Sequence, residues 1–192
     1  FQLNFEEISL KILLGIFSVS LLFTVLAFFF FFNIYVEISA LFIGWITFFL
    51  NREYVNVWKF FARNRKKFFP FCLIILFSGS FYPFIFDHFS YYVPTIKWIS
   101  EVGLVKGISN LDLLLGQMSV WHIFQGGFSN FSDPFLRMNT LVLNIYLIYI
   151  FEKKSWVHLV FIPILFLFSQ SPSPDLPVIV FSLIILNEIL QS

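Results

Sequence analysis

Two acidic residues draw attention because each stands beside long apolar runs. Asp87 follows the charge-free run 68–86 and begins the polar segment DHFSYYVPTIKWISEVGLVKGISNL. Asp175 lies in the proline-rich turn SQSPSPDLPV, residues 169–178, between two further apolar segments. A carboxylate at the edge of an apolar layer is costly unless it is paired or used. We therefore treat both residues as candidate catalytic groups.

The chemistry that such a pair suits is transfer of a sugar from a lipid-linked phosphate. One carboxylate can take the proton from an acceptor hydroxyl as it attacks the anomeric carbon. Nearby cations can stabilise the departing polyprenyl phosphate. The alternative is structural: Asp is a favoured cap and turn residue, so Asp87 would cap the next helix and Asp175 would cap or solvate a turn.

The elements that must position these groups are predicted to be membrane-spanning helices. The chain has 192 residues, of which 59% are hydrophobic, 31 are phenylalanine and only 12% are charged. Several runs approach or exceed the roughly 18 to 20 apolar residues that cross a bilayer. The composition predicts an all-α fold, a polytopic transmembrane helical bundle with extracytoplasmic juxtamembrane helices.

The apolar runs define the expected spans. We expect one transmembrane domain over residues 1–192, part of a longer polypeptide, with spans at 10–32, 34–50, 68–86, 135–151, 156–170 and 177–192. The run 12–50 is too long for one helix, so we break it near residues 33–37 into a hairpin. Segment 51–67 reads as an amphipathic interfacial helix, and 120–128 is too short to cross, so we expect it at the interface.

The distribution of basic residues predicts the orientation of these spans. Nine of the 12 Lys and Arg residues fall on one side, namely Lys11, Arg52, Lys59, Arg63, Arg65, Lys66, Lys67, Lys153 and Lys154. An excess of Lys and Arg marks the cytoplasmic side, so the loop 87–133 is expected to be extracytoplasmic. The net charge of +1 gives no indication of a nucleic-acid partner, and we expect none.

Within that loop, the residues after Pro94 predict a helix lying along the membrane. Ile96, Ile99 and Val102 form one apolar stripe at helical spacing. Lys97 and Glu101 are four residues apart, so they could form an ion pair on the helix surface. His122 and His158 stand in apolar stretches and are expected to satisfy local hydrogen bonds. No spacing typical of metal ligands occurs, so we name no metal site.

The segment that begins at Asp87 resembles a pattern of bacterial polytopic glycosyltransferases of the GT-C class. That pattern reads Asp, three residues, Tyr-His, then Lys-Trp, Glu and Gly-x-Val-x-Gly-x-x-Asn-Leu. The residues that match it are Asp87, Tyr91, Lys97, Trp98, Glu101, Gly103, Val105, Gly107, Asn110 and Leu111. The turn SPSPDLPV resembles the family's later Ser-Pro-x-Pro-Asp segment and matches at Asp175. The resemblance covers roughly residues 70–185.

The resemblance implies an inverting enzyme in the bacterial inner (cytoplasmic) membrane that uses a polyprenyl-phosphate sugar on its extracytoplasmic face. Asp87 and Asp175 would be catalytic. The substrate-binding candidates are His88, Tyr91, Lys97, Glu101, Lys106, Asn110 and Arg137. Membrane lipid and the lipid-linked sugar donor are the implied partners, and some members also bind a divalent metal. The family's Tyr-His is Tyr91-Tyr92 here, which leaves His88, Lys97, Lys106 and Arg137 as candidates for the donor phosphate.

Two other classes of function remain open on the sequence. A non-catalytic membrane subunit could use the same scaffold to bind lipid or a partner in a membrane-protein complex. A polysaccharide polymerase or flippase would also present outer loops to lipid-linked sugars. Polymerases favour arginine-rich outer loops, however, and Arg137 is the single arginine on the predicted outer face. A transporter would place charges or Gly/Pro breaks at mid-span, whereas here the polar groups gather at one face.

Overall fold

The computed structural model of the chain describes residues 7–83, 85–111 and 113–191. The all-α prediction is confirmed, because these residues form helices and no strand. Residues 84, 112 and 192, which fall within the predicted third span, outer loop and last span, lie outside the described part, as does the start of the chain.

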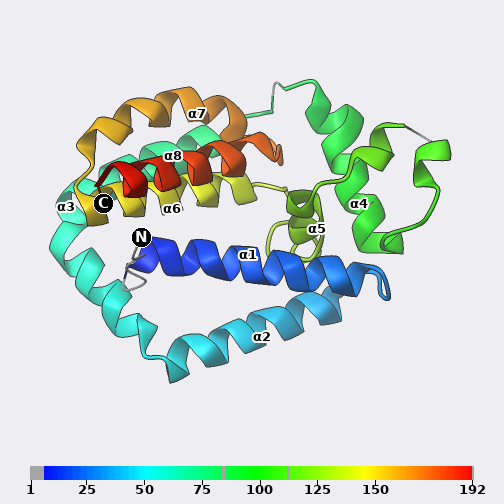
Figure 1. Cartoon of the computed structure of the whole chain (residues 1–192), viewed down its shortest axis with the longest axis horizontal. Coiled ribbons are helices and arrows are strands. Elements are labelled where there is room, and N and C mark those ends of the chain that lie inside the picture. The colour runs from blue at the N-terminus through cyan, green and yellow to red at the C-terminus, as the bar shows by residue number, and fades with distance from the viewer. Residues whose placement is uncertain (1–6, 84, 112, 192) are drawn as a thin grey trace.

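Eight α-helices follow one another within the described residues (Figure 1). They are α1 (Ile8–Ala27), α2 (Ile34–Leu50), α3 (Glu53–Ser80), α4 (Val93–Val102), α5 (Val120–Gly126), α6 (Met138–Lys153), α7 (Phe161–Ser169) and α8 (Asp175–Gln191). A π-helical turn, η1 (His88–Tyr92), leads into α4, and a 3₁₀ segment, η4 (Trp156–Val160), leads into α7.

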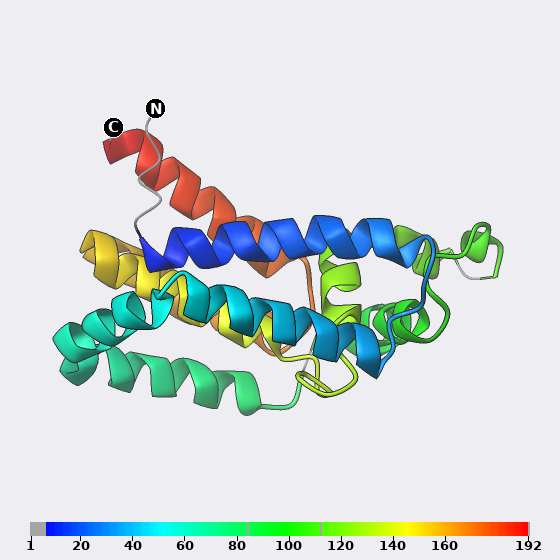
Figure 2. The same cartoon turned by 90° about the horizontal axis from the view of Figure 1, so that it is seen from below.

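Helix α6 is the centre of the molecule. It contacts α1, α3, α7 and α8, and Figures 1 and 2 show it enclosed at one end of the molecule, with α4 and α5 at the other. Leu143, Tyr146, Leu147, Tyr149 and Ile150 on this helix are completely buried. Most side chains of α6 are therefore buried, as in the core helix of a folded domain, although Leu141 is half exposed.

The prediction of a polytopic transmembrane bundle is wrong. Among the described residues one helix, α1, is long and apolar enough to cross a membrane; α2 and α3 pass the same test only as a pair, bent by 77°. Helices α6, α7 and α8 have 16, 9 and 17 residues. At about 1.5 Å per residue, each is shorter than a hydrocarbon core of about 30 Å. Composition misled for α6, because most of its apolar side chains are buried against other helices.

The predicted helices themselves occur close to their expected positions. The hairpin break falls between α1 and α2, where Asn33 caps α2 by accepting hydrogen bonds from the backbone N–H groups of Tyr35 and Val36 at 3.0 and 3.1 Å. The predicted interfacial segment 51–67 is not separate, however, because it is continuous with the third apolar run in α3. Pro70 therefore lies inside a helix rather than near its end.

The predicted outer loop 87–133 is a folded part of the domain. It contains η1, α4, α5 and two short 3₁₀ turns. Helix α5 was expected at the membrane interface, but residues 121–127 are all buried and α5 packs between α1 and α4. At Gly127 an added Cβ would come within 2.1 Å of the Phe23 ring of α1, so glycine permits the close approach.

Glu37 ties the α1–α2 hairpin to the segment between α5 and α6. Its carboxylate is completely buried and accepts hydrogen bonds from three successive backbone N–H groups, those of Asn130, Phe131 and Ser132. Three N–H donors satisfy a carboxylate that would otherwise be costly to bury. The single charge of the long apolar run 12–50 is thus a structural anchor.

Candidate active site

The two predicted catalytic carboxylates both raise the pKa of one side chain, that of Tyr92. Tyr92 is the last residue of η1 and is buried. Burial raises the pKa of its hydroxyl, Asp175 and Asp87 raise it further, and a hydrogen bond with Ser173 lowers it. Asp87 approaches from η1 and Asp175 from the start of α8. Tyr92 is therefore influenced by two acidic residues that are 88 positions apart in the sequence (175 minus 87).

Asp87 is an exposed carboxylate without a capping role. It immediately precedes η1, yet its side chain makes no capping hydrogen bond. The alternative that Asp87 only caps the following helix is therefore wrong. It also raises the pKa of Tyr91, whose hydroxyl donates to the backbone carbonyl of Gln117. Asp87 is thus available to a ligand at the surface beside the two tyrosines.

Asp175, by contrast, does have a local structural role. Its Oδ2 accepts a hydrogen bond from the Ser173 hydroxyl at 2.6 Å, and its own N–H donates to the same Oγ at 3.1 Å. This reciprocal pair begins α8, as the turn interpretation predicts for an Asp in that position. Because Ser173 also bonds Tyr92, the hydroxyl of Ser173 links Asp175 directly to the cluster.

Hydrogen bonds from a side chain of α6 hold the Ser-Pro segment before Asp175 in place. The Nδ2 group of Asn139 lies 3.1, 2.6 and 2.7 Å from the carbonyls of Phe168, Ser171 and Ser173. From α5, Gln125 donates to the carbonyl of Pro172 at 3.2 Å. Carbonyls of an irregular loop are thereby satisfied inside the protein, which fixes the position of Asp175.

The sequence analysis missed Asn139 and Gln125. Both are buried, and both stand in otherwise apolar stretches of the chain. An amide in such a stretch is a usable signal, because a buried amide must find hydrogen-bond partners. The signal does not reveal which carbonyls those partners are, since they lie 29 to 34 residues from Asn139 and 47 residues from Gln125.

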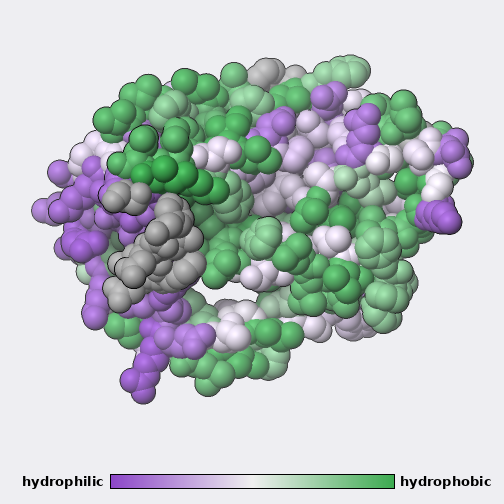
Figure 3. Space-filling view, viewed as in Figure 1, coloured by the Kyte–Doolittle hydropathy of each residue, from purple (hydrophilic) through white to green (hydrophobic). Residues whose placement is uncertain are grey.

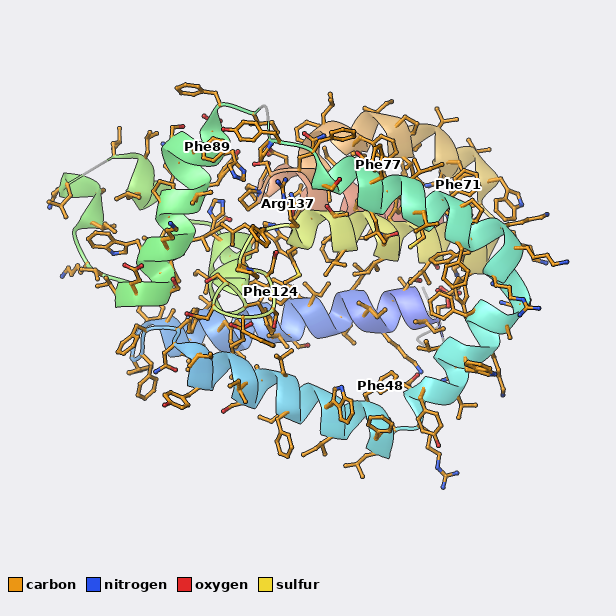
Figure 4. The ribbon with its side chains drawn as sticks, turned by 180° about the vertical axis from the view of Figure 1, so that it is seen from behind. Phe48, Phe71, Phe77, Phe89, Phe124 and Arg137 are labelled. Atoms are coloured by element: carbon orange, nitrogen blue, oxygen red, sulfur yellow. The ribbon has the colours of Figure 1, made fainter. Side chains whose placement is uncertain are left out.

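His88 and Arg137 each form a hydrogen bond with the Ser-Pro segment. His88 is buried, and its Nδ1 lies 3.3 Å from the Ser171 hydroxyl. Burial lowers the pKa of His88, and the charge of Arg137 lowers it further. Arg137, just before α6, donates from Nη1 to the carbonyl of Gln170. Figure 4 shows it between the segment that carries Phe89 and the C-terminal half of α3, marked by Phe77.

His122 on α5 completes the cluster. It is completely buried, and its ring lies 5.5 and 5.3 Å from the rings of Tyr91 and Tyr92. Nδ1 accepts the backbone N–H of Ser119 at 3.2 Å, so in the neutral ring the proton is on Nε2. Burial lowers its pKa to about 4, against an opposing effect of Asp175. The expected local hydrogen bond exists, but Nε2 has no partner within the described structure.

Four of the predicted substrate-binding residues are not part of this cluster. Lys97, Glu101, Lys106 and Asn110 are exposed, and no ion pair joins Lys97 to Glu101 among the residues that the structure describes. On α4 the predicted apolar stripe is buried at Ile96 and Ile99 but half exposed at Val102. Lys97 and Glu101 lie on the opposite face of that helix, away from the core.

The cluster does not fit a divalent metal. Within the described ranges, no group of three or more His, Cys, Asp or Glu side chains is placed to hold one. The two acidic residues have different surroundings: Asp175 is bonded to Ser173, and Asp87 is exposed beside aromatic rings. We therefore assign no chemistry at this site to a metal ion.

The described part of the chain is all-helical; Asp87, Asp175 and His122 interact with the buried Tyr92, and His88 and Arg137 bond the Ser-Pro segment. The chain belongs to the family described as a domain of unknown function (DUF8201), whose sequence model matches residues 1–192. No curated protein and no solved structure matches the chain. The resemblance to GT-C enzymes therefore rests on the motif residues themselves.

Proposed function

We propose that this protein is a glycosyltransferase that moves a sugar from a polyprenyl-phosphate donor to an acceptor hydroxyl. The observation that supports it best is that Asp87 and Asp175 both raise the pKa of Tyr92. An exposed carboxylate that neither caps a helix nor forms an ion pair in the described structure is free to accept a proton. Both residues also match the motif that resembles the GT-C class.

In this proposal Asp87 is the general base. It accepts the proton of the acceptor hydroxyl while the acceptor oxygen forms a bond to the anomeric carbon. The bond from that carbon to the phosphate oxygen breaks, and polyprenyl phosphate leaves with the electron pair. Asp175, fixed by Ser173, would hold the acceptor or a sugar hydroxyl. The attack on the face opposite the leaving group makes the transfer inverting.

The donor phosphate would bind near His88 and Arg137. Arg137 supplies a positive charge that suits a departing phosphate. His88 would bind as a neutral hydrogen-bond donor, because burial and the neighbouring Arg137 lower its pKa. Lys97 and Lys106 are given no role in this site, because both are exposed away from the cluster.

We place the protein at the bacterial inner membrane, with the cluster on the extracytoplasmic side. Support comes from α1, a helix of 20 residues that is apolar enough to cross a bilayer. Its residues Leu14, Phe17, Leu22 and Val25 are about half exposed in the structure. A lipid environment would cover these side chains and bring the lipid-linked donor to the same protein.

A non-catalytic membrane subunit is the second candidate. The exposed positions of Lys97, Glu101, Lys106 and Asn110 favour it, because motif residues that do not converge on one site suit a binding surface better than an active site. In that case the cluster around Tyr92 would serve folding, and the exposed face of α4 would meet a partner in a complex.

Substitution of Asp87 by Asn distinguishes the two candidates. The full chain in lipid is supplied with a panel of labelled polyprenyl-phosphate sugars. Loss of a general base typically lowers the rate about 10² to 10⁴-fold, so Asp87→Asn should abolish measurable transfer without changing the helical content or the unfolding midpoint. Glu101→Gln removes the same charge from the exposed face of α4 and should transfer normally. An active Asp87→Asn protein, or a wild type inactive with every donor, would favour the subunit.

A further inference from the structure

A basic cavity lies at the opposite end of the molecule from the Asp87–Asp175 cluster. It has a volume of about 420 Å³ and is formed where α3 faces the end of α6 and the start of η4. The residues that line it are Ala62, Arg63, Asn64, Arg65, Lys66, Lys67, Phe151 and Trp156. Figure 3 shows hydrophilic side chains gathered at this end of the molecule, over the N-terminal half of α3.

The charge of this cavity is uncompensated. Its four cations, Arg63, Arg65, Lys66 and Lys67, occupy four of five consecutive positions and are exposed, and no acidic residue among those that the structure describes lines the cavity. The ion pairs among the described residues involve Lys11 and Lys153 and none of these four. Like charges held this close repel one another. Binding of an anion, whose charge is opposite, would therefore be favourable.

The surface beside the cavity is apolar. Immediately after the cations, α3 exposes Phe69, Phe71, Leu73, Ile74 and Phe77. On the other side of the cavity, Trp156 and the neighbouring Val157 and Val160 are also exposed. A tryptophan between basic residues and an apolar surface is the order found across the headgroup region of a bilayer. A site for free phosphate would need the cations but not the apolar border.

We propose that this cavity binds the headgroup of an anionic phospholipid. The phosphate would lie among the four cations, Trp156 would sit at headgroup level, and the acyl chains would run along the exposed aromatic residues of α3. The proposal does not depend on glycosyl transfer, since the part of α3 that lines the cavity lies at one end of the molecule and the turn before α4 lies toward the other (Figures 1 and 2). It identifies the N-terminal half of α3 as a contact with the membrane surface.

The test measures lipid affinity with the full chain in a neutral detergent. The probes are dihexanoyl phosphatidylglycerol, dihexanoyl phosphatidylcholine and inorganic phosphate. Each basic residue near an anionic membrane surface changes affinity by about fivefold, so Arg65→Gln/Lys67→Gln should weaken binding of phosphatidylglycerol about 25-fold. Lys97→Gln/Lys106→Gln removes the same charge from the other end of the molecule and should change it less than twofold.

Four other outcomes of this test would contradict the proposal. Equal affinity of the wild type for the two lipids would exclude headgroup recognition by charge. Equal weakening by both double variants would show a general effect of net charge rather than a site. Competition by inorganic phosphate at a concentration as low as that of phosphatidylglycerol would identify a site for free phosphate. Retention of the preference for phosphatidylglycerol at 0.5 M salt, where exposed charges are screened within about 4 Å, would also contradict it.

Discussion

The indole Nε1 of Trp121 donates to Oδ1 of Asn139 at 2.8 Å, and this bond orients the Asn139 amide. With its oxygen held by α5, the amide turns its NH₂ group toward the Ser-Pro segment, where three carbonyls lie within hydrogen-bonding distance. One buried residue of α6 therefore joins α5 to the segment that begins α8. The position of Asp175 depends on this connection.

Replacement of Asn139 by Leu should destabilise the protein strongly. The change leaves the indole N–H and two or more buried carbonyls without partners, at about 1 to 3 kcal/mol for each group. We expect a loss of about 4 kcal/mol in the free energy of unfolding, measured by denaturant titration in detergent. Asn144→Leu is the matched control: within the described residues, its Nδ2 donates only to the Thr140 carbonyl of its own helix. Similar losses for the two variants would contradict the role of Asn139.

Glu37→Gln should loosen the α1–α2 hairpin. The amide keeps one acceptor oxygen but points an NH₂ group toward backbone N–H groups that now bond the carboxylate. Charge-assisted hydrogen bonds are worth about 1.5 to 3 kcal/mol each, and we expect a total cost of about 3 kcal/mol. The same substitution at Glu101, which is exposed, should cost almost nothing. Hydrogen exchange at Asn130, Phe131 and Ser132 should quicken in the Glu37 variant alone.

Helix α5 should be sensitive to any side chain at Gly127. An added methyl group would overlap the Phe23 ring, which is itself buried and packed against Phe32 and Phe128. Overpacking of this kind typically costs about 1 to 3 kcal/mol. Gly15 has open space around it, so Gly15→Ala should be neutral or slightly stabilising. A Gly127→Ala protein as stable as the wild type would show that α5 can move away from α1.

The buried His122 makes stability depend on pH. Its pKa is about 4 in the folded protein and 6.5 in the unfolded chain, so between these values the unfolded chain binds more protons. Stability should be fully present above about pH 6.5 and should fall toward pH 4, by about 3 kcal/mol at most. His122→Asn keeps an acceptor for the Ser119 N–H but cannot titrate. The free energy of unfolding of the wild type minus that of the variant should rise with pH over this window. A difference that does not change with pH would show that His122 does not titrate there.

The sequence predicted the positions of the helices well, but it did not predict whether lipid or other helices cover them. Pro94 predicted the start of α4, the last expected span began within two residues of the start of α8, and Asn33 marked the hairpin break. Helices α5 and α6 were assigned to the membrane because an apolar run looks the same beside lipid and inside a protein. Only the tertiary arrangement shows that α6 is enclosed by four other helices.

The sequence predicted only part of the site. Burial of Ile96 and Ile99 places Lys97 and Glu101 on the outer face of α4, which the predicted apolar stripe already implied. The pairing of Asp87 with Asp175 was predicted only from the shared face of two distant segments, and Tyr92 was not predicted as part of the site. The roles of Ser173, His122 and Asn139 required the Ser-Pro segment to be placed in three dimensions.

The π-helical turn before α4 makes the geometry of the motif depend on the number of residues in the turn. The N–H of Val93 bonds the carbonyl of His88, five residues earlier, so the turn holds one residue more than an α-helical turn. Deletion of the exposed Ser90 would let this turn close as an α-helix and rotate everything before it by about 100° relative to α4. Asp87 would then face away from Tyr92. A relative shorter by one residue in this turn would keep the composition of the motif and lose its geometry, so insertions and deletions here matter more than most substitutions.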